Sequence, residues 1–283
     1  MRRRLDAELV RRGLFSSREK AQQAIADHRV LVSGSVADRS ARQVDPSEPI
    51  ELRGDAPRFV SRGGEKLDAA LQRFGLDVEG LDAFDAGAST GGFTDCLLQR
   101  GVVSVLAVDV GFGQIHERLR ADRRVDVRER VNLRTVSVST LAGERQFPLL
   151  VGDLSFISLI SVASNLVELL NEDGDMVLLV KPQFEAGRAD VAKGRGVIRD
   201  PAIWLSTLQS VVSAFCQRGL AMMSVMPSPI TGADGNVEFL VHFRKQVPSG
   251  AVNLDADAQS RAVASTLLLT TAVDEAQIRE GVL

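Results

Sequence analysis

A glycine-rich segment, Asp85-Ala-Gly-Ala-Ser-Thr-Gly-Gly-Phe-Thr-Asp95, separates an apolar run from a stretch with helical spacing. Glycines at such a turn let the backbone approach a ligand closely, because no Cβ stands in the way. The first amides of the following helix then face that ligand. A second apolar run ends about one βαβ unit later at Asp109, where a carboxylate can accept both hydroxyls of a ribose. The segment therefore predicts an open α/β sheet that binds a nucleoside-containing cofactor.

The glycine spacing narrows the choice of cofactor. From Gly87 it reads G-x-x-x-G-G, which is neither the dinucleotide pattern G-x-G-x-x-G nor the phosphate-binding pattern G-x-x-x-x-G-K-[ST]. Asp85, at the end of the first strand, places a carboxylate beside the cofactor, and this suits the positively charged amino-acid part of S-adenosylmethionine (SAM) better than a pyrophosphate. SAM is therefore favoured. The alternative is a tight turn that binds nothing, and Asp109 argues against it.

Length and composition are typical of a two-domain globular protein. The chain has 283 residues, of which 45% are hydrophobic and 25% charged. No apolar run approaches the ~18 to 20 residues of a membrane span, and no apolar stretch follows the basic N-terminus as it would in a signal peptide. Cys96 and Cys216 are too few for a disulfide framework and lack metal-ligand spacing. We therefore expect a cytoplasmic protein without a bound metal.

Charge is distributed unevenly along the chain. The net charge is −3, yet residues 1–62 hold 13 Lys and Arg against 9 Asp and Glu, a net of +4, so the remaining 221 residues carry −7. Such asymmetry indicates one module that contacts phosphate and another that need not. A solvated helix face explains the same pattern, and charge alone does not decide between the two.

The first 55 residues predict a small α+β domain. Its expected helices and short strands lie at 5–13, 17–28, 30–36 and 50–52. The sequence here resembles the S4-type RNA-binding domain, in which basic side chains on two short helices and a small sheet contact RNA. The phrases that carry the resemblance are Arg4-Leu5-Asp6, Gly13-Leu14, Ser17-Arg18 and Val30-Leu31-Val32. His28-Arg29 and Ser33 depart from the pattern at turn positions.

A linker over 56–62 and a larger domain over 63–250 are expected to follow. From Leu81 onward, strands and helices alternate as in a doubly wound α/β sheet. The candidate strands are 81–86, 102–109, 125–129, 148–153 and 175–181, and the candidate helices are 91–100, 114–121, 158–171 and 201–218. Runs at 220–226 and 237–244 predict an antiparallel hairpin that closes the sheet. The basic segment 187–196 predicts a mobile substrate loop, and the tail over 251–283 predicts an acidic amphipathic helix.

Charged residues stand at the ends of two apolar strands. Asp153 ends Val151-Gly152-Asp153, and Lys181 ends the most hydrophobic strand of the chain. Ligand chemistry in an open α/β sheet gathers at the carboxyl ends of the strands, so both side chains should lie near Asp109. Lys66, just before the larger fold begins, and Glu238, in an apolar run, complete the set. Singly, each is better explained as a surface residue; together they are better explained as a site.

This set of groups suits methyl transfer to a hydroxyl. Methyl transfer from SAM is an in-line displacement, so the protein mainly positions the acceptor. A ribose 2′-hydroxyl is a weak acid, and an amine can take its proton only if burial and a nearby cation lower the amine's pKa from ~10.4. Lys66 supplies a cation, while Asp153 and Glu238 orient the ammonium groups. Methylation of a base would need other groups, such as an Asn-Pro-Pro-Tyr motif or a reactive cysteine, and the chain has no Tyr.

The larger domain resembles the FtsJ-like ribose 2′-O-methyltransferases, whose catalytic tetrad is Lys-Asp-Lys-Glu. With the S4-type domain in front, the chain to about residue 245 is similar to the TlyA family, whose members methylate cytidine 2′-hydroxyls in 16S and 23S ribosomal RNA and are often named hemolysins. The phrases that carry the resemblance lie at 61–67, 85–94, 153–158, 179–185 and 235–239. The resemblance implies a tetrad of Lys66, Asp153, Lys181 and Glu238. It implies a SAM pocket formed by Asp85, Gly87, Ser89, Thr90, Gly91, Phe93, Asp109 and Asp153.

Ribosomal RNA within ribosomal subunits is the expected partner, with no membrane involved and a monomer as the favoured state. The side chains expected to contact RNA are Arg2, Arg3, Arg4, Arg18, Lys20, Arg188, Lys193 and Arg195. Two alternatives stay open. One is an RNA-binding protein with an inactive methyltransferase fold, against which the four tetrad positions argue. The other is a membrane-active hemolysin, for which the sequence supplies neither a spanning segment nor a cationic amphipathic helix.

Overall fold

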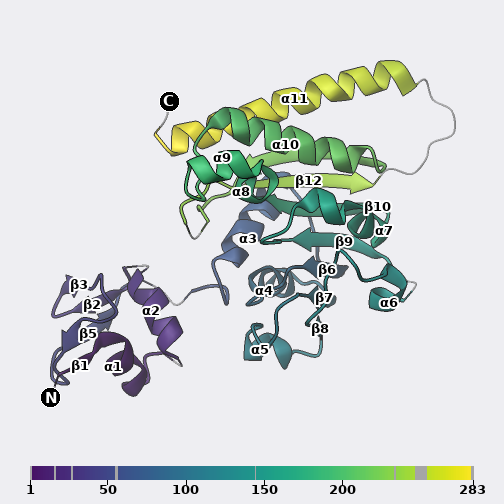
Figure 1. The fold of residues 1–283 in the computed structure, drawn as a ribbon. Coiled ribbons are helices and arrows are strands. Elements are labelled where there is room, and N and C mark those ends of the chain that lie inside the picture. Colours follow the sequence, from purple (N-terminus) through teal and green to yellow (C-terminus); the bar gives the residue numbers. More distant parts are fainter. Residues whose placement is uncertain are drawn as a thin grey trace. The chain divides into compact units, whose positions relative to one another are not determined.

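The structure is a computed structural model that describes residues 2–15, 17–26, 28–54, 57–143, 145–232, 234–245 and 254–281, leaving out the side chains of Lys20, Gln23, Arg188 and residues 254–266. The chain forms two compact units, Met1–Arg58 and Phe59–Leu283 (Figure 1). No helix among the described residues is long and apolar enough to cross a membrane.

The N-terminal unit packs two helices on short strands. Its elements are β1 (Arg3–Arg4), α1 (Leu5–Arg11), α2 (Arg18–Ala26), β2 (Val30–Val32), β3 (Ser35–Val36), β4 (Gln43–Val44) and β5 (Ile50–Leu52). β2 pairs antiparallel with β3 and β5, and β1 pairs antiparallel with β4. Leu5 and Leu9, one turn apart on α1, and Ala21 and Ile25, one turn apart on α2, are buried against Val30. Each helix therefore buries one apolar stripe.

The second unit contains a seven-stranded mixed sheet. Its strands are β6 (Asp82–Ala86), β7 (Ser104–Val108), β8 (Val125–Arg128), β9 (Phe147–Gly152), β10 (Leu170–Val180), β11 (Leu220–Pro227) and β12 (Phe239–Lys245). Their order is β11-β12-β10-β9-β6-β7-β8. β12 is antiparallel to both neighbours, and the remaining pairs are parallel. The strand order reverses between β6 and β9, where an open α/β sheet forms a crevice at the carboxyl ends of its strands.

Helices cover both faces of this sheet (Figure 1). They are α3 (Gly63–Phe74), α4 (Gly92–Gln99), α5 (Glu117–Arg120), α6 (Val138–Ala142), the 3-10 helix η1 (Leu159–Val162), α7 (Ala163–Glu168), α8 (Pro182–Glu185), α9 (Arg188–Lys193), α10 (Pro201–Cys216) and α11 (Leu254–Arg279). Leu178 of β10 lies in one core cluster with Trp204 of α10, while the adjacent Leu179 lies in the other with Leu67 of α3. This alternation is expected of a strand that is buried on both faces.

Helix α3 was missed by the sequence analysis, which placed Lys66 ahead of the fold. The helix starts with two glycines, Gly63 and Gly64, which have low helix propensity and hide its first turn. The first turn of α3 crosses α4 closely at Gly92, because a Cβ at Gly92 would lie 2.9 Å from the backbone nitrogen of Gly64. Lys66 therefore belongs to a helix whose position is set by backbone-to-backbone packing.

Other boundaries also differ from those expected. The predicted helix at 158–171 is divided into η1 and α7, and β10 begins at Leu170, five residues earlier than predicted. The start of that strand was not predicted because residues 171–173 are polar and interrupt the apolar run. The predicted loop over 187–196 contains the short helix α9. β1 and β4 have only two residues each, too few to show a pattern.

The glycine crossing can be tested by unfolding. We expect Gly92→Ala to lower the free energy of unfolding by about 1–3 kcal/mol, because the added methyl overpacks the contact with α3. Gly63→Ala is the matched control: its Cβ would meet no atom closer than 3.5 Å, so it should be neutral or slightly stabilising. Urea unfolding midpoints would measure both, and an unchanged midpoint for Gly92→Ala would contradict the close crossing.

Candidate active site

The turn between β6 and α4 packs between the end of β7 and the residue after β9. Gly87 has a φ of +83°, and a Cβ there would lie 2.9 Å from the carbonyl oxygen of Asp153. The amides of Gly87 and Ala88 both donate to the carbonyl oxygen of Val108, at 2.8 and 3.1 Å. No side chain other than hydrogen fits at Gly87 without displacing the end of β9. Glycine there is thus a requirement of the fold as well as an opening for a ligand.

Asp109, the residue after β7, stabilises the same turn through hydrogen bonds. Its two carboxylate oxygens accept hydrogen bonds from the amides of Ser89, at 2.7 Å, and Gly111, at 2.6 Å. A carboxylate has about four acceptor positions, so these bonds leave room for further donors. The side chain therefore holds the turn and still offers acceptors to a ligand.

Two lysine–carboxylate pairs stand at the carboxyl edge of the sheet. Lys66 Nζ lies 2.5 Å from Glu238 Oε2, and Lys181 Nζ lies 2.6 Å from Asp153 Oδ1. Lys181 also donates to Ser155 Oγ at 2.6 Å. Both lysines are only 8% exposed, and a desolvated ammonium is costly unless it is paired. Each of the two ammonium groups is therefore paired with one carboxylate.

All four charged side chains line one cavity of about 390 Å³. The predicted cofactor residues on its wall are Gly87, Ser89, Thr90 and Phe93. A second cavity of about 460 Å³ shares Gly87, Ser89 and Asp153 with the first, and Asp109 and residues 131–134 also line it. Gly91 and Asp85 line neither cavity: Gly91, with a φ of +95°, shapes the turn, and Asp85 lies beneath it. Among the described residues, no group of three or more His, Cys, Asp or Glu could hold a metal ion.

Asp85 is a buried carboxyl with one free oxygen. It is 0% exposed. Its Oδ2 accepts a hydrogen bond from Thr94 Oγ1 at 2.6 Å, while Oδ1 has no hydrogen-bond partner. Burial is the main reason that the pKa of Asp85 rises to about 7, and the nearby carboxylate of Asp153 raises it further. Because Asp85 lines neither cavity, this carboxyl is a buried charge behind the cavity wall.

Two aromatic residues at the first cavity were not assigned a role from the sequence. Phe156 is 91% exposed and has a φ of +62°, which is uncommon for a bulky residue. Its ring centroid lies 5.2 Å from that of Phe184, and both residues line the cavity. Glu185 connects the two segments that carry these rings, because it accepts hydrogen bonds from Ser158 Oγ at 2.6 Å and from the amide of Leu159 at 2.7 Å. The available signal was an aromatic residue three positions after each of Asp153 and Lys181.

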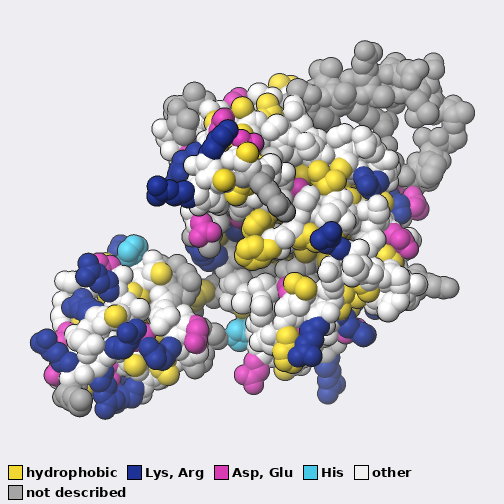
Figure 2. All heavy atoms as spheres, viewed as in Figure 1, with side chains coloured by type: hydrophobic (Ala, Val, Ile, Leu, Met, Phe, Trp, Pro, Cys, Tyr) yellow, Lys and Arg dark blue, Asp and Glu magenta, His cyan; other side chains and the backbone are white. Residues whose placement is uncertain are grey.

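Lys and Arg side chains are spread over the visible face of the N-terminal unit (Figure 2). Arg2 and Arg3 are exposed. Arg4 and Arg18 both donate to Asp6, each at 2.9 Å, and the Asp6 carboxylate is fully buried. The Arg4 guanidinium is the main reason that the pKa of Asp6 lies well below its usual range. Two of the predicted RNA-contacting arginines are thus anchored by one carboxylate.

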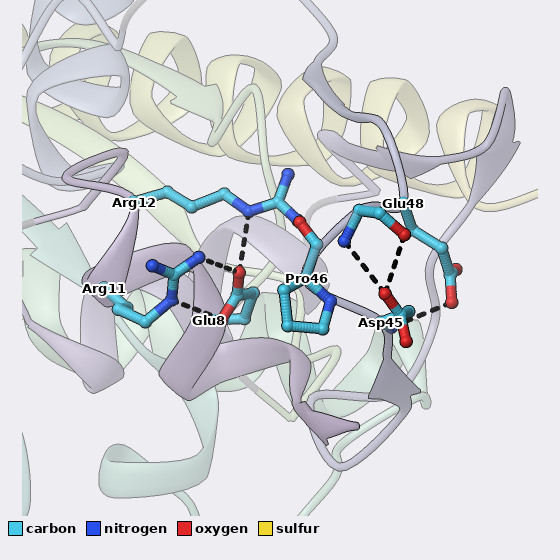
Figure 3. Close-up of polar contacts among 7 residues, drawn as sticks. Glu8, Arg11, Arg12, Asp45, Pro46 and Glu48 are labelled. Atoms are coloured by element: carbon cyan, nitrogen blue, oxygen red, sulfur yellow. Dashed lines mark hydrogen bonds and ion pairs between the residues drawn. The ribbon is translucent and has the colours of Figure 1, made fainter. Parts of the chain in front are cut away.

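Glu8 holds a second pair of arginines that the sequence analysis did not single out (Figure 3). Arg11 lies 2.6 Å and Arg12 2.9 Å from Glu8 Oε1, and Arg12 also donates to the carbonyl oxygen of Pro46 at 2.9 Å. The Arg11 guanidinium is the main reason that the pKa of Glu8 falls to about 2. A charged residue within a helix that also carries buried leucines was the only available signal, and charged side chains are rarely fully buried.

The remaining side chains that were predicted to contact RNA are Lys20, Arg188, Lys193 and Arg195. The side chains of Lys20 and Arg188 lie outside the described residues. Lys193 pairs with Asp190 at 3.3 Å, and Arg195 is exposed. Neither Lys193 nor Arg195 lines the two cavities.

Two family models match the chain: FtsJ-like methyltransferase over residues 59–245 and S4 domain over residues 3–50. Over 246 residues the chain is 43% identical to the 16S/23S rRNA (cytidine-2′-O)-methyltransferase TlyA of Mycobacterium tuberculosis, covering 87% of this chain and 91% of that protein. It is 40% identical over 240 residues to Hemolysin A of Brachyspira hyodysenteriae, covering 85% and 99%. A solved hemolysin-type structure from Streptococcus thermophilus is 35% identical, with a TM-score of 0.72 over 99% of this chain and 98% of that one. The expected α/β fold class is confirmed.

The raised pKa of Asp85 predicts a specific dependence of stability on pH. The pKa is about 7 in the folded protein, against ~3.9 for an unfolded Asp. Folding therefore takes up a proton between these values, so the contribution of Asp85 to stability falls as pH rises from about 4 to about 7. Asp85→Asn removes this loss, and the melting temperature of the variant relative to wild type should increase from pH 5 to pH 8. A difference that does not change with pH would contradict the buried, proton-binding carboxyl.

Proposed function

Because the chain belongs to the TlyA family of FtsJ-like methyltransferases, we propose that it transfers a methyl group from SAM to the ribose 2′-hydroxyl of a cytidine in 16S or 23S ribosomal RNA. The observation that carries the proposal is that Lys66, Asp153, Lys181 and Glu238 meet at one cavity. The name of the Mycobacterium tuberculosis relative supplies the substrate class.

Residues around the β6–α4 turn fit SAM, which when bound supplies an electrophilic methyl group. Asp85 lines neither cavity, so its charge acts on the cationic end of that molecule from behind the cavity wall and not by direct contact. Asp109 keeps acceptor positions for ribose hydroxyls. Around them, the turn contributes backbone without large side chains at Gly87 and Gly91, and it contributes the side chains of Ser89, Thr90 and Phe93.

Lys181 is the group that we assign to the acceptor hydroxyl. An ammonium has three N–H donors. Lys181 donates one of them to Ser155 Oγ, and its ion pair with Asp153 holds the ammonium in place. An N–H donor therefore remains for the acceptor oxygen. The Lys66–Glu238 pair places a second ammonium at the same cavity, so two preorganised cations stabilise the negative charge on the acceptor oxygen while its proton passes to solvent and the methyl group bonds to that oxygen. The carboxylates keep both ammonium groups in place.

Phe156 and Phe184 suit the base of the acceptor nucleotide. A nucleotide inside a helix must leave its stack before its ribose can enter an enclosed site. An aromatic ring replaces part of the lost stacking, and the exposed ring of Phe156 lies at the cavity that holds the lysines. The N-terminal unit supplies further affinity through phosphate contacts of its arginines, so binding should weaken with salt.

Transfer of tritium from methyl-labelled SAM to purified 30S and 50S subunits, followed by nuclease mapping, tests the function. We expect label on a ribose 2′-oxygen, and we expect Lys181→Ala to reduce its incorporation by about 10²-fold or more, because the variant removes a positioned group from the reacting oxygen. Lys245→Ala is the control, since Lys245 pairs with Glu172 at 3.0 Å near the other end of the sheet.

The outcomes separate the alternatives. Label on a base would show that the four charged residues have been assigned the wrong chemistry. An absence of label on either subunit, although the protein binds SAM, would favour an RNA-binding protein with an inactive methyltransferase fold.

The buried carboxylates of the N-terminal unit lead to a second prediction. Asp6→Asn removes a negative charge, which by simple electrostatics should strengthen RNA binding. We expect the opposite, a loss of about 3- to 10-fold in affinity for the subunits, because Arg4 and Arg18 lose the group that preorganises them. Asp38→Asn removes the same charge from an exposed side chain (70%) and should not weaken binding. Filter binding at several salt concentrations would measure both, and equal or tighter binding by Asp6→Asn would refute the anchoring role.

A further inference from the structure

Helix α11 lies beyond the residues that match the FtsJ-like methyltransferase model, which end at 245. It packs along α10 in Figure 1. Leu269, Ala272, Val273 and Ala276 are buried in the same core cluster as Trp204 of α10. Their spacing of three and four residues places them on one face of the helix. The last three turns of α11 are thus part of the folded unit.

The end of α11 contacts the segment that carries Glu238. Arg279 donates from Nη1 to the carbonyl oxygen of Ser228, the residue after β11. Ser228 is 5% exposed, and its amide donates to the carbonyl oxygen of Glu238 at 2.8 Å. One guanidinium and one buried serine therefore connect the C-terminal helix to the backbone of Glu238.

The connection between β11 and β12 encloses the Glu238 carboxyl. Ser228 Oγ donates to the carbonyl oxygen of Ile230 at 2.6 Å, and the amide of Gly232 donates to the carbonyl oxygen of Asn236 at 2.8 Å. A Cβ at Gly232 would lie 2.7 Å from Glu238 Oε1. Because the backbone at Gly232 lies so close to the carboxyl, a small shift of this segment would move the acceptor of Lys66.

The same helix contacts the element that carries Lys66. Glu275 of α11 pairs with Arg73 of α3 at 3.1 Å. Arg73 lies seven residues after Lys66, about two helical turns away. This pair is exposed and contributes little by itself. Helix α11 thus contacts both the helix that carries Lys66 and the segment that precedes Glu238.

We propose that α11 is a positioning element of the active site, in which Arg279 orders the β11–β12 connection so that Glu238 meets Lys66. Arg279 acts through Ser228 and touches neither ligand. The inference rests on the proposed methyl transfer for its effect on rate, whereas its effect on backbone order is independent of the reaction.

The test compares full-length Arg279→Ala, Arg279→Lys and Ile278→Ala. Ile278 is the matched control because it is the adjacent residue on α11 and is 65% exposed. A truncation is not used, because it would remove the buried residues of α11 and uncover the core. Hydrogen–deuterium exchange measures the order of residues 228–238, and single-turnover methyl transfer to ribosomal subunits measures the rate.

In Arg279→Ala we expect faster exchange over 228–238, with α10 unchanged. We expect a rate about 10- to 100-fold lower at unchanged KM for SAM, as displacement of a positioning group predicts. Arg279→Lys, which keeps a donor, should recover most of both, and Ile278→Ala should match wild type.

Unchanged exchange over 228–238 in Arg279→Ala would overturn the inference, and so would faster exchange with an unchanged rate. If wild type methylates neither subunit, the proposed function fails, and the exchange comparison alone then decides whether Arg279 orders the segment.

Discussion

The desolvation of two lysines at one edge of a sheet is the constraint on which the rest of the site depends. Lys66 and Lys181 are almost entirely buried, and a buried ammonium without a partner destabilises the fold. Asp153 and Glu238 supply the partners. These charges come from α3, from the residues directly after β9 and β10, and from the segment before β12, so the fold must bring four separate segments together to satisfy them. The arrangement needed for stability is also the one that places two cations at one cavity.

Close backbone packing sets the positions of these elements. Glycines at the α3–α4 crossing and at the β6–α4 turn let backbones meet where side chains would separate them. The turn is then held by the carboxylate of Asp109 and by the carbonyl oxygen of Val108. The N-terminal unit uses a similar principle, because the buried carboxylates of Asp6 and Glu8 each hold two guanidiniums at its surface. In both units, buried acidic groups determine where exposed or reactive cations stand.

Much of the fold was predictable because its strands are apolar and its turns rich in glycine. The carboxyl ends of parallel strands share one edge, so the closeness of Asp153 and Lys181 followed from the strand assignment. The sequence analysis placed Lys66 and Glu238 in one set, but nothing in it indicated that these two residues, 172 positions apart, pair with each other. Helix α3 was not predicted because it begins with two glycines, and glycine has a low helix propensity. Asp6 and Glu8 were missed because nothing in the sequence shows that a charged residue on a short helix is buried. No role could be assigned to Phe156 from the sequence, because its role depends on its position beside Phe184 at the cavity, which only the structure shows.

We propose that the two lysine–carboxylate pairs act as one unit on one acceptor oxygen. A double-mutant cycle of Lys66→Met and Lys181→Met tests it most directly, with the single-turnover rate of methyl transfer to ribosomal subunits as the measurement. Groups that act as a unit give losses that are far from additive. We expect the double variant to be about as slow as the slower single variant. Losses in rate that multiply, as for two independent sites, would contradict it.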